Sequence, residues 1–205
     1  YNSYVMTQIS INRKNRARDI ANIIFFVASV ICGTLLINAF VFCSYSIVGR
    51  SMENTLFQND RVIVNRLPVT WAQIKNTPYI PKRGEIIVFE NPQHASRQQD
   101  RYLIKRVVGL PGDRVTIKNN KITVVNKEHP DGFDPNKDLK DPMSTEISGE
   151  VDNVEVQDSH LFVIGDHREG SHSYDSRNGL GQVPFHTVVG PVSMRLFPLT
   201  NFRWF

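Results

Sequence analysis

No charged residue occurs between Ile20 and Phe42, and this uncharged stretch divides the chain into a short N-terminal segment and a longer C-terminal part. As a helix rising 1.5 Å per residue, the stretch spans roughly 35 Å, slightly more than the ~30 Å hydrocarbon core of a bilayer. It is too long for the apolar core of a cleavable leader. The sequence therefore predicts a transmembrane helix over residues 20–42.

Cysteine is scarce. Cys32 and Cys43 are the only two, and both lie in or beside the apolar stretch. Eleven residues apart on a helix, they are too distant to form a disulfide with each other. Their spacing also excludes a C-x-x-C redox or zinc site. The rest of the chain must be held together by apolar burial, and both cysteines are interpreted as small apolar filler.

Basic charge is also scarce outside the N-terminal segment. The net charge is +4, and residues 1–19 supply most of it through four Lys and Arg residues against Asp19. A nucleic-acid-binding protein would spread basic residues over its folded part, so we expect no nucleic-acid partner. By the positive-inside rule, residues 1–19 form a cytoplasmic tail and residues 43–205 lie outside the cytoplasmic membrane.

No long amphipathic helix is visible after Phe42. Short β-branched runs punctuated by Pro and Gly predict strands instead; they lie at 61–65, 85–89, 101–108, 113–117, 121–125, 160–164 and 188–196. Asn119 and Asn120 offer a hairpin turn between two of them. The fold class is mainly β, in a barrel-like or sandwich arrangement.

Two segments stand apart from the strands. Residues 68–82 carry Trp71 and Tyr79, and we interpret them as a surface loop, either simply packed or meeting the membrane surface. Residues 126–150 are polar and rich in Pro, Asp and Lys, and we expect an exposed insertion outside the core.

Ser51 follows Gly49-Arg50, where a tight turn would present its hydroxyl rather than bury it. Such a nucleophile needs a base. His167 and His172 lie near Asp166 and Asp175, which leaves a Ser-His-Asp arrangement conceivable. Metal ligation by His94, His167 and His172 is conceivable too, although the histidines lack the spacing of known zinc motifs and we assign neither a metal nor a cofactor.

Lys105 is the better candidate base. In a strand, Leu103, Lys105 and Val107 share one face, and Ile104, Arg106 and Val108 share the other, so both faces carry apolar neighbours of the lysine. Desolvation disfavours the ammonium and lowers the pKa of a lysine toward the working pH. The alternative is a lysine whose stem packs while its head reaches water.

Three stretches, in this order, resemble the sequence boxes of bacterial type I signal peptidases. They are Ser46–Leu56 around the serine, Tyr102–Asp113 around the lysine, and Gly165–Arg168 followed by Ser173–Arg177. Residues 83–89 match a further box, and the resemblance extends from the apolar stretch to about Pro184. It implies coiled antiparallel sheets in one extracytoplasmic domain with an N-terminal transmembrane helix.

The resemblance also implies roles for single residues. Ser51 would be the nucleophile and Lys105 the general base of an acyl-enzyme mechanism. Ser173 would hydrogen-bond the lysine, with Ser171 and Ser176 as competitors for that role, while Asp175 and Arg177 would form a structural ion pair. His167 departs from the family's asparagine, and the loop between Arg168 and Asp175 is longer than usual.

The substrates implied are exported preproteins with small side chains at −1 and −3. Apolar residues near Ser51 and Lys105 are the expected substrate contacts: Tyr45, Ile47, Val48, Leu56 and Ile104. The Ser51 N–H is the first expected oxyanion donor; some relatives add a hydroxyl at the position of Gly49, which has none.

Membrane lipids are the other expected partners, and we expect a monomer in the cytoplasmic membrane. Two rival functions remain open. One is a self-cleaving Ser-Lys peptidase of the repressor type, which would need a DNA-binding N-terminal domain in place of the apolar stretch. The other is a membrane-tethered β-domain that only binds partners, in which Ser51 and Lys105 could be exchanged freely.

Overall fold

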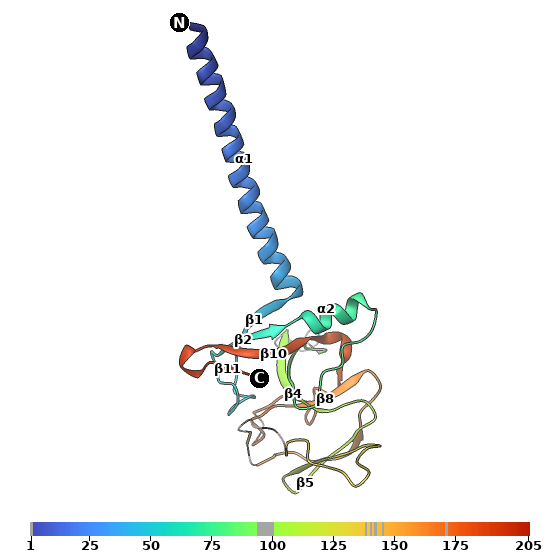
Figure 1. Cartoon of the computed structure of the whole chain (residues 1–205). Helices are drawn as coiled ribbons and strands as arrows, with labels where there is room; N and C mark the ends of the chain where they lie inside the picture. The colour runs from blue at the N-terminus through green and yellow to red at the C-terminus, as the bar shows by residue number, and fades with distance from the viewer. Residues whose placement is uncertain are drawn as a thin grey trace. The chain divides into compact units, whose positions relative to one another are not determined.

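A computed structural model describes residues 2–93, 101–137, 139, 141, 143–144, 146–170 and 172–205. The chain divides into two compact units, residues 1–41 and 42–205. The first is the helix α1, Asn2–Phe40, shown in blue in Figure 1. Its segment Arg18–Phe40 is long and apolar enough to cross a membrane by length and composition. The helix includes most of the expected basic tail and ends two residues before the expected boundary, because Phe42 already belongs to a strand.

The regular secondary structure of the second unit consists mainly of antiparallel strands, as predicted. Its larger sheet has the order β1-β2-β10-β3-β4-β8-β9, with β11 paired to β10. Those strands are β1 Phe42–Ser46, β2 Arg61–Asn65, β3 Ile86–Glu90, β4 Tyr102–Gly109, β8 His160–Ile164, β9 Val183–Pro184, β10 Val188–Phe197 and β11 Arg203–Trp204. The smaller sheet, β6-β5-β7, consists of β5 Arg114–Lys118, β6 Lys121–Val125 and β7 Val151–Glu155.

Turn chemistry fixes the strand ends. Asn119 and Asn120 both have positive φ, 51° and 65°, as a two-residue hairpin between β5 and β6 requires. Gly112 has φ 80° in the turn that ends β4, and Asp113 N–H donates to Leu110 C=O over 3.0 Å. The hairpin turn predicted at Asn119 and Asn120 is confirmed.

Three apolar clusters form the core. One lies between β2, β3 and β10 and includes Met52, Leu56 and Val62, which places it directly beneath the serine segment. A second packs the inner face of the smaller sheet against Val108 and Phe162 of the larger one. The third lies around Phe89, Val107 and Val163. Strand β4 contributes to the core on both of its faces, so a side chain in the middle of this strand is enclosed.

Two expectations about irregular segments were wrong in part. Residues 68–82 are not simply a loop, because the helix α2, Leu67–Ile74, fills their first half. Elsewhere in the unit the structure also has two short 3-10 turns, η1 Phe185–Thr187 and η2 Leu199–Asn201. Residues 126–150 do not stay outside the core. Phe133 forms a bridge with Val124, and Phe133 and Ile147 pack on the core of the smaller sheet.

Candidate active site

The segment that carries Ser51 is held by two hydrogen bonds to the chain just before β2. Ile47 N–H donates to Asp60 C=O over 2.8 Å, and Asn59 N–H donates to Ile47 C=O over 2.9 Å. Gly49 then turns the backbone with φ 86°, in open surroundings, so it serves the turn and not a close approach. Met52 is completely buried directly after Ser51 and anchors the turn in the core.

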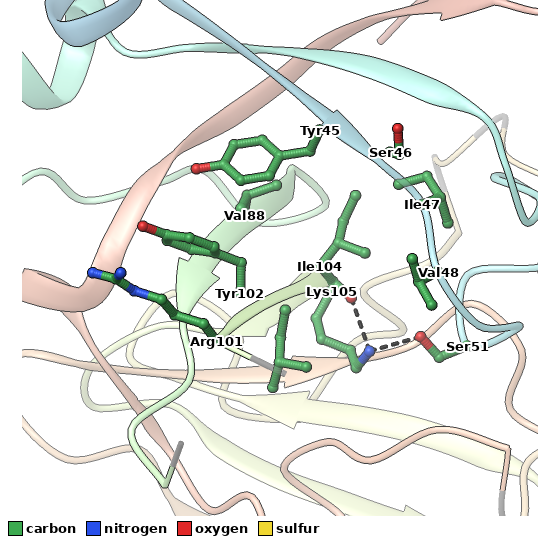
Figure 2. A pocket seen from close by; sticks show the side chains of 11 residues that line it. Tyr45, Ser46, Ile47, Val48, Ser51, Val88, Arg101, Tyr102, Ile104 and Lys105 are labelled. Atoms are coloured by element: carbon green, nitrogen blue, oxygen red, sulfur yellow. Dashed lines mark hydrogen bonds between the residues drawn. The ribbon is translucent and has the colours of Figure 1, made fainter. Parts of the chain in front are cut away.

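Lys105 lies in the middle of β4, opposite Ile87 of β3, and only 2% of it is exposed. Its Nζ donates hydrogen bonds to Ser51 Oγ over 2.7 Å and to Ile104 C=O over 2.9 Å, as the dashed lines in Figure 2 show. The structure therefore brings together the two side chains that the sequence singled out, from segments 54 residues apart.

Burial lowers the pKa of Lys105 to about 8, because the ammonium loses its hydration. The negative charges of Asp175 and Asp166 oppose this effect, and the positive charge of Arg177 adds to it. With this pKa about a tenth of the Lys105 side chains are neutral amines at pH 7 and about half are at pH 8, and the neutral amine is the form that can accept a proton.

Asp175 holds together the loop that follows β8. Its carboxylate accepts two hydrogen bonds from the Arg177 guanidinium, over 3.0 and 2.9 Å, one from Ser173 Oγ over 2.6 Å and one from Gly165 N–H over 3.0 Å. Burial by itself would raise the pKa of Asp175, but Arg177, Ser173 and the Gly165 amide together hold it below its usual range. The expected Asp175–Arg177 ion pair is present, and both side chains are buried.

Ser173 does not occupy the expected position. Its hydroxyl donates to Asp175, while the hydrogen-bond partners of Lys105 among the described residues are Ser51 and Ile104. Ser176, one competitor, is also engaged elsewhere: its hydroxyl donates to Gly181 C=O and accepts from Val163 N–H. The other competitor, Ser171, lies outside the described residues. Ser173 is thus hydrogen-bonded to Asp175, whose charge acts on Lys105, and not to the lysine itself.

Gly165 is required by close packing. A Cβ at this position would overlap both the carbonyl oxygen of Ser51 and the side chain of Ser173. His167 N–H, two residues later, donates to the same Ser51 carbonyl over 3.1 Å. The end of β8 and the serine turn are therefore in direct contact, which fixes Ser51 from a second side.

Sequence reasoning missed the buried pair Arg106–Asp166. Arg106 Nε and Nη2 donate to the two oxygens of Asp166 over 2.7 and 2.5 Å, and Nη2 also meets Asp141 over 2.7 Å. Arg106 follows Lys105 and faces the opposite side of β4. The pair joins β4, the loop after β8 and the 126–150 segment. The signals for it in the sequence were an Asp two residues after a buried strand and an Arg beside the lysine.

The histidine alternatives gain no support. His167 Nδ1 lies 3.2 Å from Arg50 C=O and 3.6 Å from a Glu53 carboxylate oxygen, and its ring stacks on His172. The side chain that meets Ser51 Oγ is Lys105. Within the described ranges no three His, Cys, Asp or Glu residues gather closely enough to hold a metal ion. His94 lies outside those ranges.

A cleft of about 240 Å³ opens directly beside the Ser51–Lys105 pair (Figure 2). Four of the five expected contacts line it: Tyr45, Ile47, Val48 and Ile104. Leu56 does not, because it is completely buried in the core beneath the turn, and that expectation was wrong. The missed lining residues are Ser46, Val88, Arg101, Tyr102 and Leu103.

Two tyrosines bound the cleft on the side away from Ser51. The rings of Tyr45 and Tyr102 meet edge to face, with centroids 5.3 Å apart. The cleft is thus small, apolar near the serine and aromatic at its outer end.

Comparison with known proteins gives a consistent result. The family model described as signal peptidase, peptidase S26, matches residues 18–197. A signal peptidase I from Bacillus caldolyticus is 35% identical over 188 residues, covering 88% of this chain and 92% of that protein. Signal peptidase I P from Bacillus subtilis subsp. natto is 31% identical over 191 residues, covering 91% and 95%. A solved signal peptidase I from Enterococcus faecalis aligns more loosely, with a TM-score of 0.38 and 21% identity, over 56% of this chain and 98% of that one.

Proposed function

Because this chain belongs to the signal peptidase family, peptidase S26, and is a serine peptidase of the signal peptidase I type, we propose that Ser51 and Lys105 are its catalytic dyad. The observation that carries this proposal is the 2.7 Å contact between Lys105 Nζ and Ser51 Oγ at a buried lysine whose pKa is about 8. Because the two atoms are in direct contact, the neutral amine can take the hydroxyl proton without an intermediate group.

The reaction follows from that contact. Lys105 Nζ takes the proton as Ser51 Oγ attacks the carbonyl carbon of the −1 residue. The Ser51 N–H donates to no acceptor among the described hydrogen bonds, which leaves it free to stabilise the oxyanion. Lys105 then returns the proton to the departing amine, and the signal peptide remains as an ester on Ser51. A water molecule, deprotonated by Lys105, hydrolyses this acyl-enzyme.

The substrates are exported preproteins with small residues at −1 and −3. The cleft lined by Ile47, Val48 and Ile104 is the proposed binding site for these residues, because it is lined by apolar side chains and opens beside Ser51. The charges of Asp175 and Arg177 act on the pKa of Lys105, and Ser173 acts through its hydrogen bond to Asp175. We further propose that the protein is a monomer anchored by one helix in the cytoplasmic membrane, with residues 43–205 outside.

The test uses the full chain in detergent with a purified preprotein. Mass spectrometry should find cleavage after a small residue by the wild type and none by Ser51→Ala. A reaction quenched rapidly in acid should contain signal peptide esterified to Ser51. Replacing the −1 residue of the preprotein with Leu should abolish cleavage. A scaffold protein would behave alike in wild type and Ser51→Ala, and that result would reject the proposal.

A further inference from the structure

The helix α2 presents an apolar stripe to solvent that the catalytic proposal does not use. Leu67, Trp71 and Ile74 are 48%, 60% and 67% exposed. At about 100° per residue, positions i, i+4 and i+7 fall within an arc of about 60°. Val69, on the opposite side, is only 7% exposed and packs inward. The helix therefore has two apolar faces, one packed against its own unit and one exposed to solvent.

The strand register places α2 at one particular end of its unit. Asn65, the last residue of β2, pairs with Phe42, the first residue of β1, and Leu67 N–H donates to Asn65 Oδ1 over 3.0 Å. Only Val41 separates Phe42 from the last residue of α1. Two residues of chain reach about 7 Å at most, whatever the orientation of the two units. Within its own unit, the start of α2 thus lies beside the strand end from which the chain continues to the apolar helix.

Charge and aromatic content fit the surface of a bilayer. Lys75 directly follows α2, and its ammonium lies 5.0 Å from the centre of the Trp71 ring. Tryptophan favours the interface between headgroups and acyl chains, and a neighbouring cation meets anionic headgroups. We propose that the Leu67–Trp71–Ile74 stripe lies in the outer interface of the same membrane that α1 crosses. This proposal rests on the membrane anchoring proposed above.

Such docking would hold the catalytic unit against the bilayer. The segment that carries Ser51 continues from β1, which pairs directly with β2, so fixing α2 limits how far the cleft can swing from the lipid surface. A membrane-embedded signal peptide presents its cleavage site near that surface. Docking should therefore favour membrane-held substrates over free peptides, through a higher effective concentration.

Fluorescence of single-tryptophan chains tests the contact. The full chain with Trp204→Phe keeps Trp71 alone and is reconstituted into vesicles of phosphatidylcholine and phosphatidylglycerol, with or without brominated acyl chains. An interfacial helix lies about 5–10 Å into the headgroup and acyl boundary. Trp71 emission should shift to the blue in vesicles, and shallow bromines should quench it more than deep ones.

The control places the tryptophan in the smaller sheet, which lies away from β1 and α2 within its unit (Figure 1). The control chain carries Lys121→Trp together with Trp71→Phe and Trp204→Phe. Its tryptophan is exposed to water on β6, in the sheet away from α2, so bromines in the bilayer should not quench it.

Three other results would each overturn the proposed contact with lipid. Vesicle-bound chain with unquenched Trp71 overturns the docking and leaves the anchor intact. Chain that fails to float with vesicles overturns both. A blue shift that grows with protein concentration, without quenching, assigns the stripe to a second copy of the chain and rejects lipid.

Activity provides a second readout. Changing Leu67, Trp71 and Ile74 together to Ser should lower cleavage of a vesicle-embedded preprotein on the order of tenfold. Cleavage of a soluble peptide should stay within about twofold, since α2 does not line the cleft. Gln73→Ser, also exposed on α2 but outside the stripe, is the matched control and should leave both activities unchanged. Equal losses on both substrates would contradict docking.

Discussion

Lys105 is buried within an antiparallel sheet. This burial lowers the pKa of the lysine, which enables it to accept a proton but also lowers the free energy of unfolding of the protein. The unfolded chain keeps the ordinary lysine pKa near 10.5, while the folded value is about 8. Between these values the unfolded chain binds a proton that the folded chain rejects. The free energy of unfolding must therefore fall as pH falls from about 10.5 to about 8, and then level off.

Replacing the amine should make the protein inactive and more stable. The two pKa values correspond to a penalty of about 3 kcal/mol at pH 7. Lys105→Met keeps most of the stem and removes the titrating group. It should exceed the wild type in stability by up to about that amount at pH 7, and the difference should vanish above pH 10.5. Urea midpoints from pH 6 to 11 measure this; equal midpoints at pH 7 would mean a hydrated lysine.

Asp175 supplies a second prediction at this scale. Asp175→Ala leaves the buried Arg177 guanidinium unpaired, a loss on the order of 3–5 kcal/mol. The negative charge of Asp175 also raises the pKa of Lys105, so its removal should shift the rising limb of the pH–activity profile to lower pH. Thermal melting and that profile check both effects. Unchanged melting with lost activity would instead give Asp175 a direct part in the chemistry.

The sequence predicted the residues of the site better than their contacts. Ser51 and Lys105 were chosen from their neighbours and the structure brings them together, but Ser173 was assigned to the wrong partner. Its position two residues before Asp175 allows a local hydrogen bond that no box reveals. Leu56 was chosen because it is near Ser51 in sequence, yet the turn directs it into the core.

At the scale of elements, the contact between the end of β8 and the serine turn leaves no room for a side chain at Gly165. Gly165→Ala should push Ser51 and Ser173 apart, costing about 1–3 kcal/mol in stability and most of the activity. The matched control is Gly33→Ala in α1, where nothing lies near the new Cβ. Circular dichroism melting and peptide cleavage measure both. A fully active, stable Gly165→Ala chain would show that the contact does not position Ser51.

Element prediction succeeded where period and turn chemistry agreed. The strands at 61–65, 121–125 and 160–164 were predicted at the observed bounds. β1 was missed because its first residue continues an apolar run, and α2 because Pro68 suggested a loop although proline suits the first turn of a helix. β7 is polar on its exposed side and gave no signal. Pairings between distant strands, such as β2 with β10, depend on the whole chain.

For the whole molecule, the charge asymmetry around α1 predicts the topology. Protease added outside intact spheroplasts should degrade the chain after Phe42 and spare the segment before Asp19. The reason is that four basic residues between 13 and 18 favour the cytoplasmic side. Immunodetection with tags at either end of the chain reads the result. Protection of the C-terminal tag in spheroplasts, with digestion after lysis, would reverse the orientation.

The central claim is that a neutral Lys105 takes the proton of Ser51, and the pH dependence of preprotein cleavage tests it most directly. Single-turnover rates of the wild type between pH 6 and 10 should rise with an apparent pKa near 8, since only the neutral amine accepts a proton. Lys105→Arg should be inactive at every pH, because a guanidinium stays protonated. A flat wild-type profile, or robust turnover by Lys105→Arg, would contradict the account.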